Sequence, residues 1–238
     1  MQMSEWQIWY EKILNDFNFS LKDDEDSAII LSKLLDGISF LKINDLIDTF
    51  ESYDKAIVFG AGPSLLKHIQ IIKNCQDLED YILIAADGAS SALLSENLVP
   101  DIIVTDLDGK LEDLYKANKK GSIMVIHAHG NNSNEISEHT LKFNNILGTT
   151  QSKPIKNLYN FGGFTDGDRA IFLAVDLNVS EIVLAGMDFG NIVTKFSRPN
   201  ILNDTEIADD IKIKKLKYAE CLTQWIVDNE NIKIKKLK

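Results

Sequence analysis

The sequence predicts an α/β protein whose mostly parallel sheet is covered by helices on both faces. From about residue 54, short β-branched apolar runs alternate with helical stretches, as in chains that return to one sheet through helices. The runs are almost continuously apolar, which is typical of parallel strands buried on both faces. The predicted strands cover residues 56–59, 81–86, 102–105, 123–127, 158–161 and 181–185.

Residues 1–50 precede this pattern and are predicted to form a helical N-terminal appendage. Two apolar series at three- and four-residue spacing mark its helices. They are Trp6, Trp9, Tyr10, Ile13, Leu14 and Phe17, followed by Ile30, Leu34, Ile38 and Leu41. Because stripes of this kind usually face a core, we expect them to pack inward; an exposed surface for a partner or a membrane is the alternative.

Residues 51–204 are expected to form the α/β catalytic domain. Near its end, residues 191–206 have mixed polarity around Arg198-Pro199, which predicts a mobile loop or lid.

Residues 205–238 form a basic C-terminal segment, predicted to be a helix plus an edge strand. Residues 211–238 have a net charge of +5, whereas residues 1–210 have −16. We expect the two parts to attract each other, within one chain or across a homodimer; a solvated lysine face is the alternative. The same seven residues occur at 211–217 and at 232–238. The first copy is predicted to open the helix and the second to form the strand.

Composition excludes several classes of protein. With 238 residues, 45% apolar and 26% charged, the chain matches ordinary globular proteins. It has no long apolar segment and no signal-like amino terminus, so we expect a cytoplasmic protein without membrane contact. The net charge of −11 argues against nucleic acid as a partner. Cys75 and Cys221 are expected to be buried small residues, because their spacing fits neither a zinc site nor a disulfide.

Six aspartates lie at or just past the ends of apolar runs, and they suggest a metal site. They are Asp87, Asp101, Asp106, Asp108, Asp166 and Asp188. Asp106 and Asp108 are two residues apart, so in an extended segment both face one side and hold one cation, with Asp87 completing the ligand set. Oxygen ligands at this density suit Mg²⁺ shared with substrate phosphates. Asp101 follows a proline, and its alternative role is to accept backbone hydrogen bonds.

Three further motifs follow predicted strands. The Gly60-Ala61-Gly62-Pro63-Ser64 turn opens a helix and is expected to approach phosphates, with a plain strand-to-helix turn as the alternative. His127-Ala128-His129-Gly130-Asn131-Asn132 is expected to hydrogen-bond substrate or phosphate, with helix capping by the asparagines as the alternative. Residues 161–170 lead into a helix predicted at 170–177, and they carry Arg169, one of only two arginines. We expect Arg169 to grip phosphate; the alternative is that it braces the loop through Asp166 or Asp168.

The motifs at residues 85–89, at residues 100–109 and at Thr165-Asp166 resemble those of thiamine pyrophosphokinases, which have an aspartate-glycine pair, a proline-aspartate and a paired-aspartate motif in the same order. With residues 59–65, 127–132, 161–170 and 186–190 added, the sequence resembles the archaeal 6-hydroxymethyl-7,8-dihydropterin pyrophosphokinase family more closely, over residues 50–230. The resemblance implies a Rossmann-like, thiamine-pyrophosphokinase-like fold, Mg²⁺ and ATP, and a place in tetrahydromethanopterin or folate-type pterin synthesis. Two positions depart from the related patterns. Asn131 replaces an aspartate of the pterin family, and Gly109 stands where the thiamine enzymes typically have serine.

The implied reaction is transfer of diphosphate from ATP to a primary hydroxyl, with AMP as the leaving group. Asp87, Asp106 and Asp108 are assigned to Mg²⁺, and Asp106, Asp108, Arg169 and His127 to catalysis. The expected nucleotide contacts are Gly60, Gly62, Pro63, Ser64, Asp87 and Gly88. The expected substrate contacts are His129, Asn132, Gly163, Thr165, Asp166, Asp168 and Asp188. His127 or His129 orients or deprotonates the alcohol, and Asp166 or Asp188 accepts hydrogen bonds from the pterin. A thiamine pyrophosphokinase, a nucleotide-sugar-dependent glycosyltransferase-like protein and a non-enzymatic nucleotide sensor are the alternatives.

Overall fold

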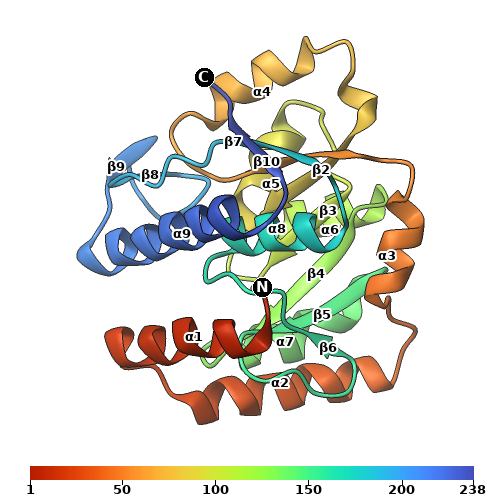
Figure 1. Ribbon diagram of the computed structural model, residues 1–238, viewed down its shortest axis with the longest axis vertical. Helices are drawn as coiled ribbons and strands as arrows, with labels where there is room; N and C mark the ends of the chain where they lie inside the picture. The colour runs from red at the N-terminus through yellow and green to blue at the C-terminus, as the bar shows by residue number, and fades with distance from the viewer.

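The computed structural model describes residues 1–238 and contains an eight-stranded, fully parallel sheet (Figure 1). The strand order is β10-β7-β1-β2-β3-β4-β5-β6. The strands are β1 Lys55–Phe59, β2 Tyr81–Ala86, β3 Ile102–Thr105, β4 Ile123–Ala128, β5 Ile146–Thr150, β6 Leu158–Tyr159, β7 Glu181–Ala185 and β10 Lys233–Lys236. The predicted α/β class with a mostly parallel sheet is confirmed.

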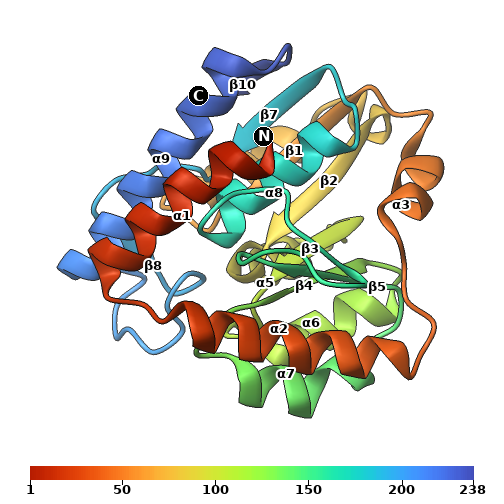
Figure 2. The same ribbon diagram turned by 60° about the horizontal axis from the view of Figure 1, so that its bottom comes forward.

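Helices cover both faces of the sheet (Figures 1 and 2). One face carries α1 Met3–Phe17, α3 Ile43–Phe50, α8 Asp166–Asp176 and α9 Asp210–Asn229. The other carries α2 Leu21–Asp36, α4 Leu65–Lys73, α5 Asp87–Ser95, α6 Leu111–Lys119 and α7 Ser133–His139. Short 3-10 turns occupy Leu78–Asp80 and Thr140–Lys142.

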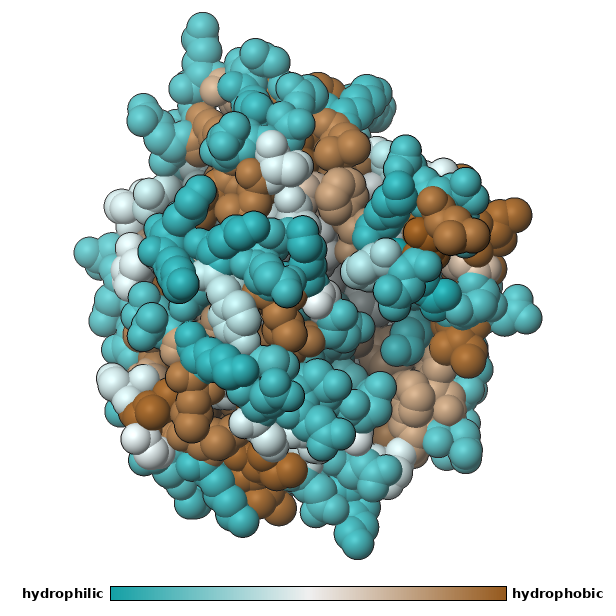
Figure 3. All heavy atoms as spheres, turned by 180° about the vertical axis from the view of Figure 1, so that it is seen from behind, coloured by the Kyte–Doolittle hydropathy of each residue, from teal (hydrophilic) through white to brown (hydrophobic).

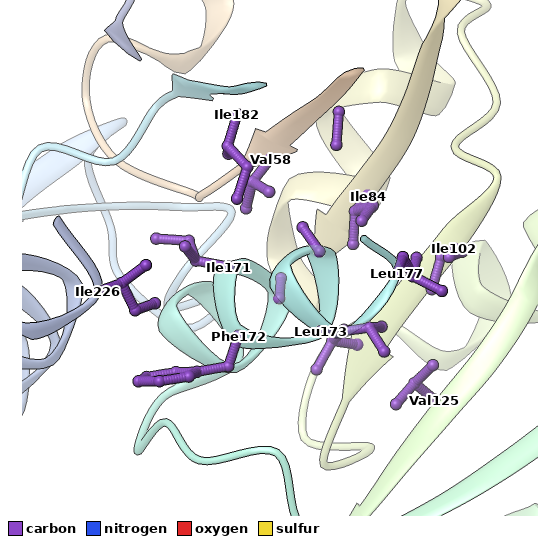
Figure 4. Packing of buried hydrophobic residues seen from close by; sticks show 14 of the residues in the cluster. Val58, Ile84, Ile102, Val125, Ile171, Phe172, Leu173, Leu177, Ile182 and Ile226 are labelled. Carbon is purple, nitrogen blue, oxygen red and sulfur yellow. The ribbon is translucent and has the colours of Figure 1, made fainter. Parts of the chain in front are cut away.

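Each strand sends successive side chains to opposite cores, which explains the continuous apolar runs. In β1, Val58 lies in the core under α8, whereas Ile57 and Phe59 pack against α4 and α5. Figure 4 shows the α8 core, where Ile171 and Leu173 of the helix face the strands.

The N-terminal helices pack inward, as expected from their apolar spacing. Trp6, Tyr10 and Ile13 of α1 are buried in the same core as α8. Figures 1 and 2 show α1 beside α9, and Tyr218 of α9 donates a hydrogen bond to Asp16 of α1 at 2.5 Å. The aromatic stripe therefore stabilises the fold.

Local structure differs from the predictions at four places. Strand β5 was missed because Gly148-Thr149-Thr150 interrupts its apolar run. Strand β6 is shorter than predicted, and α8 begins at Asp166, four residues before the predicted start. Residues 191–206 contain most of an antiparallel hairpin, β8 Ile192–Thr194 and β9 Thr205–Ile207.

The duplicated heptapeptide adopts two conformations, as predicted. Residues 211–217 lie in α9, and residues 232–238 contain β10, the edge strand that pairs in parallel with β7. Lys233 and Lys235 both contact Glu181 of β7, at 3.1 and 2.6 Å. The basic segment and the acidic body therefore meet within one chain.

The surface corrects one expectation. Cys75 and Cys221 are both exposed, because Cys75 lies in the segment just after α4 and Cys221 lies on the solvent side of α9. Figure 3 shows a largely hydrophilic face whose apolar side chains form separate patches. None of the helices has the length and apolar character needed to span a bilayer.

Candidate active site

A cavity of about 940 Å³ lies at the carboxyl ends of the strands. The size fits a small-molecule site, and the position is where ligands bind in open parallel sheets. Its lining includes eleven predicted site residues: Gly60, Gly62, Asp87, Gly88, Asp106, Asp108, His129, Thr165, Asp166, Arg169 and Asp188. Pro63, Ser64, His127, Asn132, Gly163 and Asp168 are absent from the lining.

Four of the lining aspartates form a carboxylate cluster: Asp87, Asp106, Asp108 and Asp166. One oxygen from each lies within 4.8 Å of the others. Asp87 starts α5 after β2, Asp106 and Asp108 follow β3, and Asp166 starts α8. Because three chain segments supply these side chains, only the packed sheet brings them together.

The β3 loop reaches this geometry by a tight turn and not by the extended segment that we predicted. Leu107 has a φ of 67° and buries its side chain, which leaves Asp106 and Asp108 free to lie in the cluster. Thr105 accepts a hydrogen bond from Leu107 N at 2.8 Å and donates one to Asp87. A Cβ at Gly109 would lie 1.7 Å from Asp87 Oδ1, so any larger residue there displaces Asp87.

The cluster is electrostatically unfavourable without a cation. Burial raises the pKa of Asp87 to about 7, and its Oδ1 has no hydrogen-bond partner. Burial and the charge of Asp106 raise the pKa of Asp108 to about 7 and that of Asp166 well above its usual value. Burial also opposes ionisation of Asp106, but the hydrogen bond and charge of His129 outweigh it and lower that pKa.

These residues fit a divalent metal ion. The cluster offers hard oxygen ligands, and the unpartnered Asp87 Oδ1 is a buried acceptor that a cation would satisfy. Asp166 joins the three residues assigned to metal from the sequence.

The two histidines have different positions. Nε2 of His129 lies 3.0 Å from Oδ2 of Asp106 at the cavity wall. His127 is buried away from that wall with Nδ1 3.0 Å from Thr149 Oγ1, and burial followed by the charge of Arg169 holds its pKa well below the usual value. The structure therefore favours His129 as the histidine that meets a ligand.

Asn132 serves the protein and not the cavity. Its side-chain nitrogen donates to the backbone oxygens of His127 and Asp106, both at 2.8 Å. Its oxygen accepts from His129 N at 3.0 Å and from Ser27 Oγ at 3.2 Å. With all these atoms used, Asn132 connects the end of β4 with Asp106 after β3 and with Ser27 of α2, which corrects its assignment as a substrate contact.

The loop before α8 positions Arg169 beside the cluster. Gly163 has a φ of 87°, and a Cβ there would lie 2.6 Å from Arg169 N. Asp168 is fully buried and accepts from Phe164 N and Thr165 N at 2.6 and 2.8 Å, so it braces the loop and does not face a substrate. Arg169 Nη1 lies 3.3 Å from Asp166 Oδ1, and its buried Nε has no partner.

The turn that begins at Gly60 makes its hydrogen bonds within the protein, whereas we predicted that it binds phosphate. Gly60 N and Gly62 N donate to β7 and the loop after it, and Ser64 N and Oγ donate to Asp188 Oδ2 at 3.0 and 2.9 Å. A carboxylate thus already occupies the start of α4. The two glycines allow close packing, since a Cβ at Gly62 would lie 2.2 Å from Asp188 Oδ2. Ser64 and Asp188 are therefore committed to each other.

Asp101 takes the alternative role considered for it. Its Oδ2 accepts from Leu83 N at 2.8 Å and connects β2 with the segment that enters β3.

A buried network lies behind Arg169, and no sequence motif marks it. Asp24 of α2 accepts hydrogen bonds from Tyr10 at 2.5 Å, Gln151 at 2.8 Å and Gly130 N at 2.6 Å. Gln151 in turn accepts from Arg169 Nη2 at 3.0 Å. No local pattern marks Asp24, because it lies in a helix that the apolar spacing assigns to packing.

The sequence also gave no cavity role to Arg198 of the hairpin or to Lys212 and Lys215 of α9, which together form a cationic wall. Arg198 pairs with Asp209 at 2.5 Å. The hairpin lies over the β1 and β2 loops, because Thr194 donates to Ala61 O at 2.7 Å and a Cβ at Gly88 would lie 2.0 Å from Phe196 O.

The family model and the curated relatives that match this chain have closely related names. Residues 29–194 match the model of a family described as 6-hydroxymethylpterin diphosphokinase MptE-like. Two curated proteins named 6-hydroxymethyl-7,8-dihydropterin pyrophosphokinase, from Methanocaldococcus jannaschii and Methanothermobacter thermautotrophicus, are each 46% identical over 99% of this chain and all of their own length. One of the same name from Pyrococcus furiosus is 42% identical, with 98% of each chain covered.

A solved structure shares the fold alone. The MAf glycosyltransferase from Magnetospirillum magneticum AMB-1 has a TM-score of 0.50 and 17% identity, covering 78% of this chain and 34% of its own.

Proposed function

The chain belongs to the 6-hydroxymethylpterin diphosphokinase MptE-like family, and we propose that it transfers diphosphate from ATP to 6-hydroxymethyl-7,8-dihydropterin with Mg²⁺. The names of the three full-length relatives support the reaction and its pterin substrate. The proposed ATP and Mg²⁺ are the donor and the cation that such a reaction needs.

The carboxylate cluster carries the proposal. Four aspartates share a small volume at the base of a ligand-sized cavity, and Asp87 has a buried oxygen without a partner. This arrangement supports a magnesium site held by Asp87, Asp106, Asp108 and Asp166. Bound there, Mg²⁺ would neutralise charge on the phosphates and hold them in place.

The bond changes follow from the products. The hydroxymethyl oxygen of the pterin attacks the β-phosphorus of ATP, and a new P–O bond forms. The bond from the β-phosphorus to the α–β bridging oxygen breaks, so AMP leaves and the alcohol proton is released. Such transfers need alignment and charge neutralisation more than covalent help from the protein.

The chain's own residues supply that alignment. We assign Arg169 to the transferred phosphates, because its guanidinium lies beside the cluster and its buried Nε is unpaired. We assign His129, and not His127, to orient the alcohol, because only His129 lines the cavity. His129 also fixes Asp106 through their 3.0 Å contact.

The test is to incubate the protein with ATP, Mg²⁺ and 6-hydroxymethyl-7,8-dihydropterin and to separate the products. The proposal expects AMP and the pterin diphosphate in equal amounts, with loss of turnover in a chelator. Thiamine serves as the competing acceptor, and a nucleotide sugar as the competing donor. ADP as the nucleotide product, or preference for either competitor, would contradict the proposal.

A further inference from the structure

Two lysines of the cationic wall, Lys212 and Lys215, have no assigned role. Both line the cavity from the first two turns of α9. Neither ammonium group forms an ion pair or a hydrogen bond with the protein, although Asp106 and Asp108 line the same cavity. The adjacent Lys214 differs, because it points to α1 and bonds to Asp16 O at 2.6 Å.

The other cations of the cavity already have carboxylate partners. Arg169 contacts Asp166, and Arg198 contacts Asp209. Lys212 and Lys215 are therefore the cations of this cavity whose charge no carboxylate of the protein pairs with, and they would add to the contact that Arg169 makes with an anion.

Their position in the helix is locally unfavourable. The amino-terminal end of a helix carries partial positive charge, so lysines in the first turns are repelled by it. Acidic residues are favoured at the start of a helix, and here only Asp209, which caps the helix, and Asp210 are acidic. Residues that break a local preference often serve a site.

The surroundings of Lys215 strengthen the case. Its ammonium lies 5.7 Å from the ring centre of Phe19 and 5.8 Å from that of Phe164, and these aromatic faces hold it toward the cavity. Burial, followed by the charges of Lys212 and Arg169, lowers the pKa of Lys215, while Asp106 and Asp108 partly oppose this. The lysines and the carboxylate cluster are thus close enough to influence each other across the cavity.

We propose that Lys212 and Lys215 bind the polyphosphate chain of the nucleotide, so that the chain spans from the carboxylate cluster to α9. This inference rests on the proposed function, since it assumes a nucleoside triphosphate as the donor. It replaces the phosphate contacts that the sequence suggested for the Gly60 turn, where the amides of Gly60, Gly62 and Ser64 are already used. AMP lacks the β- and γ-phosphates and gains little from the lysines.

The experiment compares Lys212→Met, Lys215→Met and the double variant with Lys217→Met, an exposed lysine of the same helix. Methionine keeps an aliphatic stem, and thermal melting checks the fold. Affinities for ATP, AMP and inorganic tripolyphosphate are measured by calorimetry in the presence of Mg²⁺. Each inward-facing change should weaken ATP and tripolyphosphate by about tenfold or more and leave AMP unchanged. Lys217→Met should match the wild type, and Lys215→Arg should restore most of the affinity.

The outcomes separate the two proposals. If the wild type forms AMP from ATP but the double variant binds ATP within about twofold of it, the lysine inference is wrong. Equal losses for ATP and AMP, or a change confined to Mg²⁺ affinity, would also overturn it, because the lysines would then only offset the carboxylates. If the wild type forms ADP or leaves ATP intact, the proposed function fails, whatever the lysine variants bind.

Discussion

The carboxylate cluster and the cationic wall share one cavity but differ in how the protein supports them. Asp87 and Asp166 of the cluster lie close to other acids in a desolvated setting, and their pKa values are raised. In the cationic wall, Arg198 has a carboxylate partner, and the two lysines are partly open to solvent. The cluster is therefore the part of the site that depends most on a ligand.

This contrast explains why the lysines and the carboxylate cluster do not pair with one another. Direct contact between the lysines and the cluster would neutralise both and fill the space between them. By keeping them apart, the fold leaves room for a cation at one side and an anion between them. Four predictions test this division of roles, in order of decreasing effect.

Removing a central carboxylate should have the largest effect. Asp106→Asn deletes one cluster charge and weakens the contact with His129. We expect turnover to fall by a hundredfold to a thousandfold or so, measured as AMP release at saturating Mg²⁺. Asp80→Asn, at an exposed position, is the matched control. Activity near the wild-type level would contradict the role given to the cluster, because the cluster would then be dispensable.

Loss of the buried Asp24 network behind Arg169 should have the second-largest effect, which is on the stability of the fold. Asp24→Ala leaves Tyr10, Gln151 and Gly130 N without their common acceptor. We expect the free energy of unfolding in urea to fall by about 3 kcal/mol. The neighbouring Asp23→Ala should cost less than about 1 kcal/mol, because Asp23 is exposed. Equal losses in the two variants would show that the buried network does not stabilise the site.

The raised pKa values predict how Mg²⁺ binding depends on pH. The pKa of Asp87 is about 7 in the folded protein against 3.8 unperturbed. Between these two values the carboxyl is ionised in the unfolded chain but stays protonated in the fold. The metal-free protein is therefore more stable at low pH and loses stability as the pH rises to about 7. Mg²⁺ needs the ionised form, so its affinity should rise between pH 6 and pH 8, by at most about tenfold per pH unit for each proton displaced. Asp108 contributes less, because solvent in the cavity reaches it.

Calorimetry in buffers of different ionisation enthalpy measures those protons directly. Thermal melting should show a larger Mg²⁺ stabilisation at pH 8 than at pH 6. An affinity that does not change with pH would mean that the cluster is already ionised in the metal-free protein.

The cationic wall should yield the smallest effect. Asp209 caps α9 by accepting from Lys212 N at 2.7 Å and also pairs with Arg198. Asp209→Ala should lower the free energy of unfolding by less than Asp24→Ala does, mostly because the cap is lost. Arg198→Ala should cost less, because that ion pair is largely exposed. A larger loss for Arg198→Ala would show that the hairpin contact, and not the cap, holds this wall.

Most of the sheet and part of the site could be predicted from local pattern. Buried parallel strands give continuous apolar runs, and their carboxyl ends meet at one edge, so Asp87, Asp106 and Asp108 were found from their positions after strands. Strand β5 escaped because glycine and threonines break its run.

The roles of Asp24, Gln151 and Lys215 could not be predicted in the same way. Each acts through residues far away in the sequence, and no spacing rule connects them. The Gly60 turn shows the converse, because its glycines fit a phosphate loop locally but serve to pack against Asp188.

The two copies of the duplicated heptapeptide show which features are set locally and which depend on packing. Flanking residues fixed the conformations: Asp209 caps the first copy and an apolar helical series continues it, whereas the second copy follows a turn and alternates Ile232 and Ile234 with lysines. The surroundings of the lysines in each copy depend on the residues that the tertiary structure packs beside them. The first copy turns two lysines into the cavity, and the second sets Lys233 and Lys235 against Glu181 at the open edge of β7. Local interactions choose a helix or a strand, but the electric field at a side chain comes from distant segments that only the folded chain brings near.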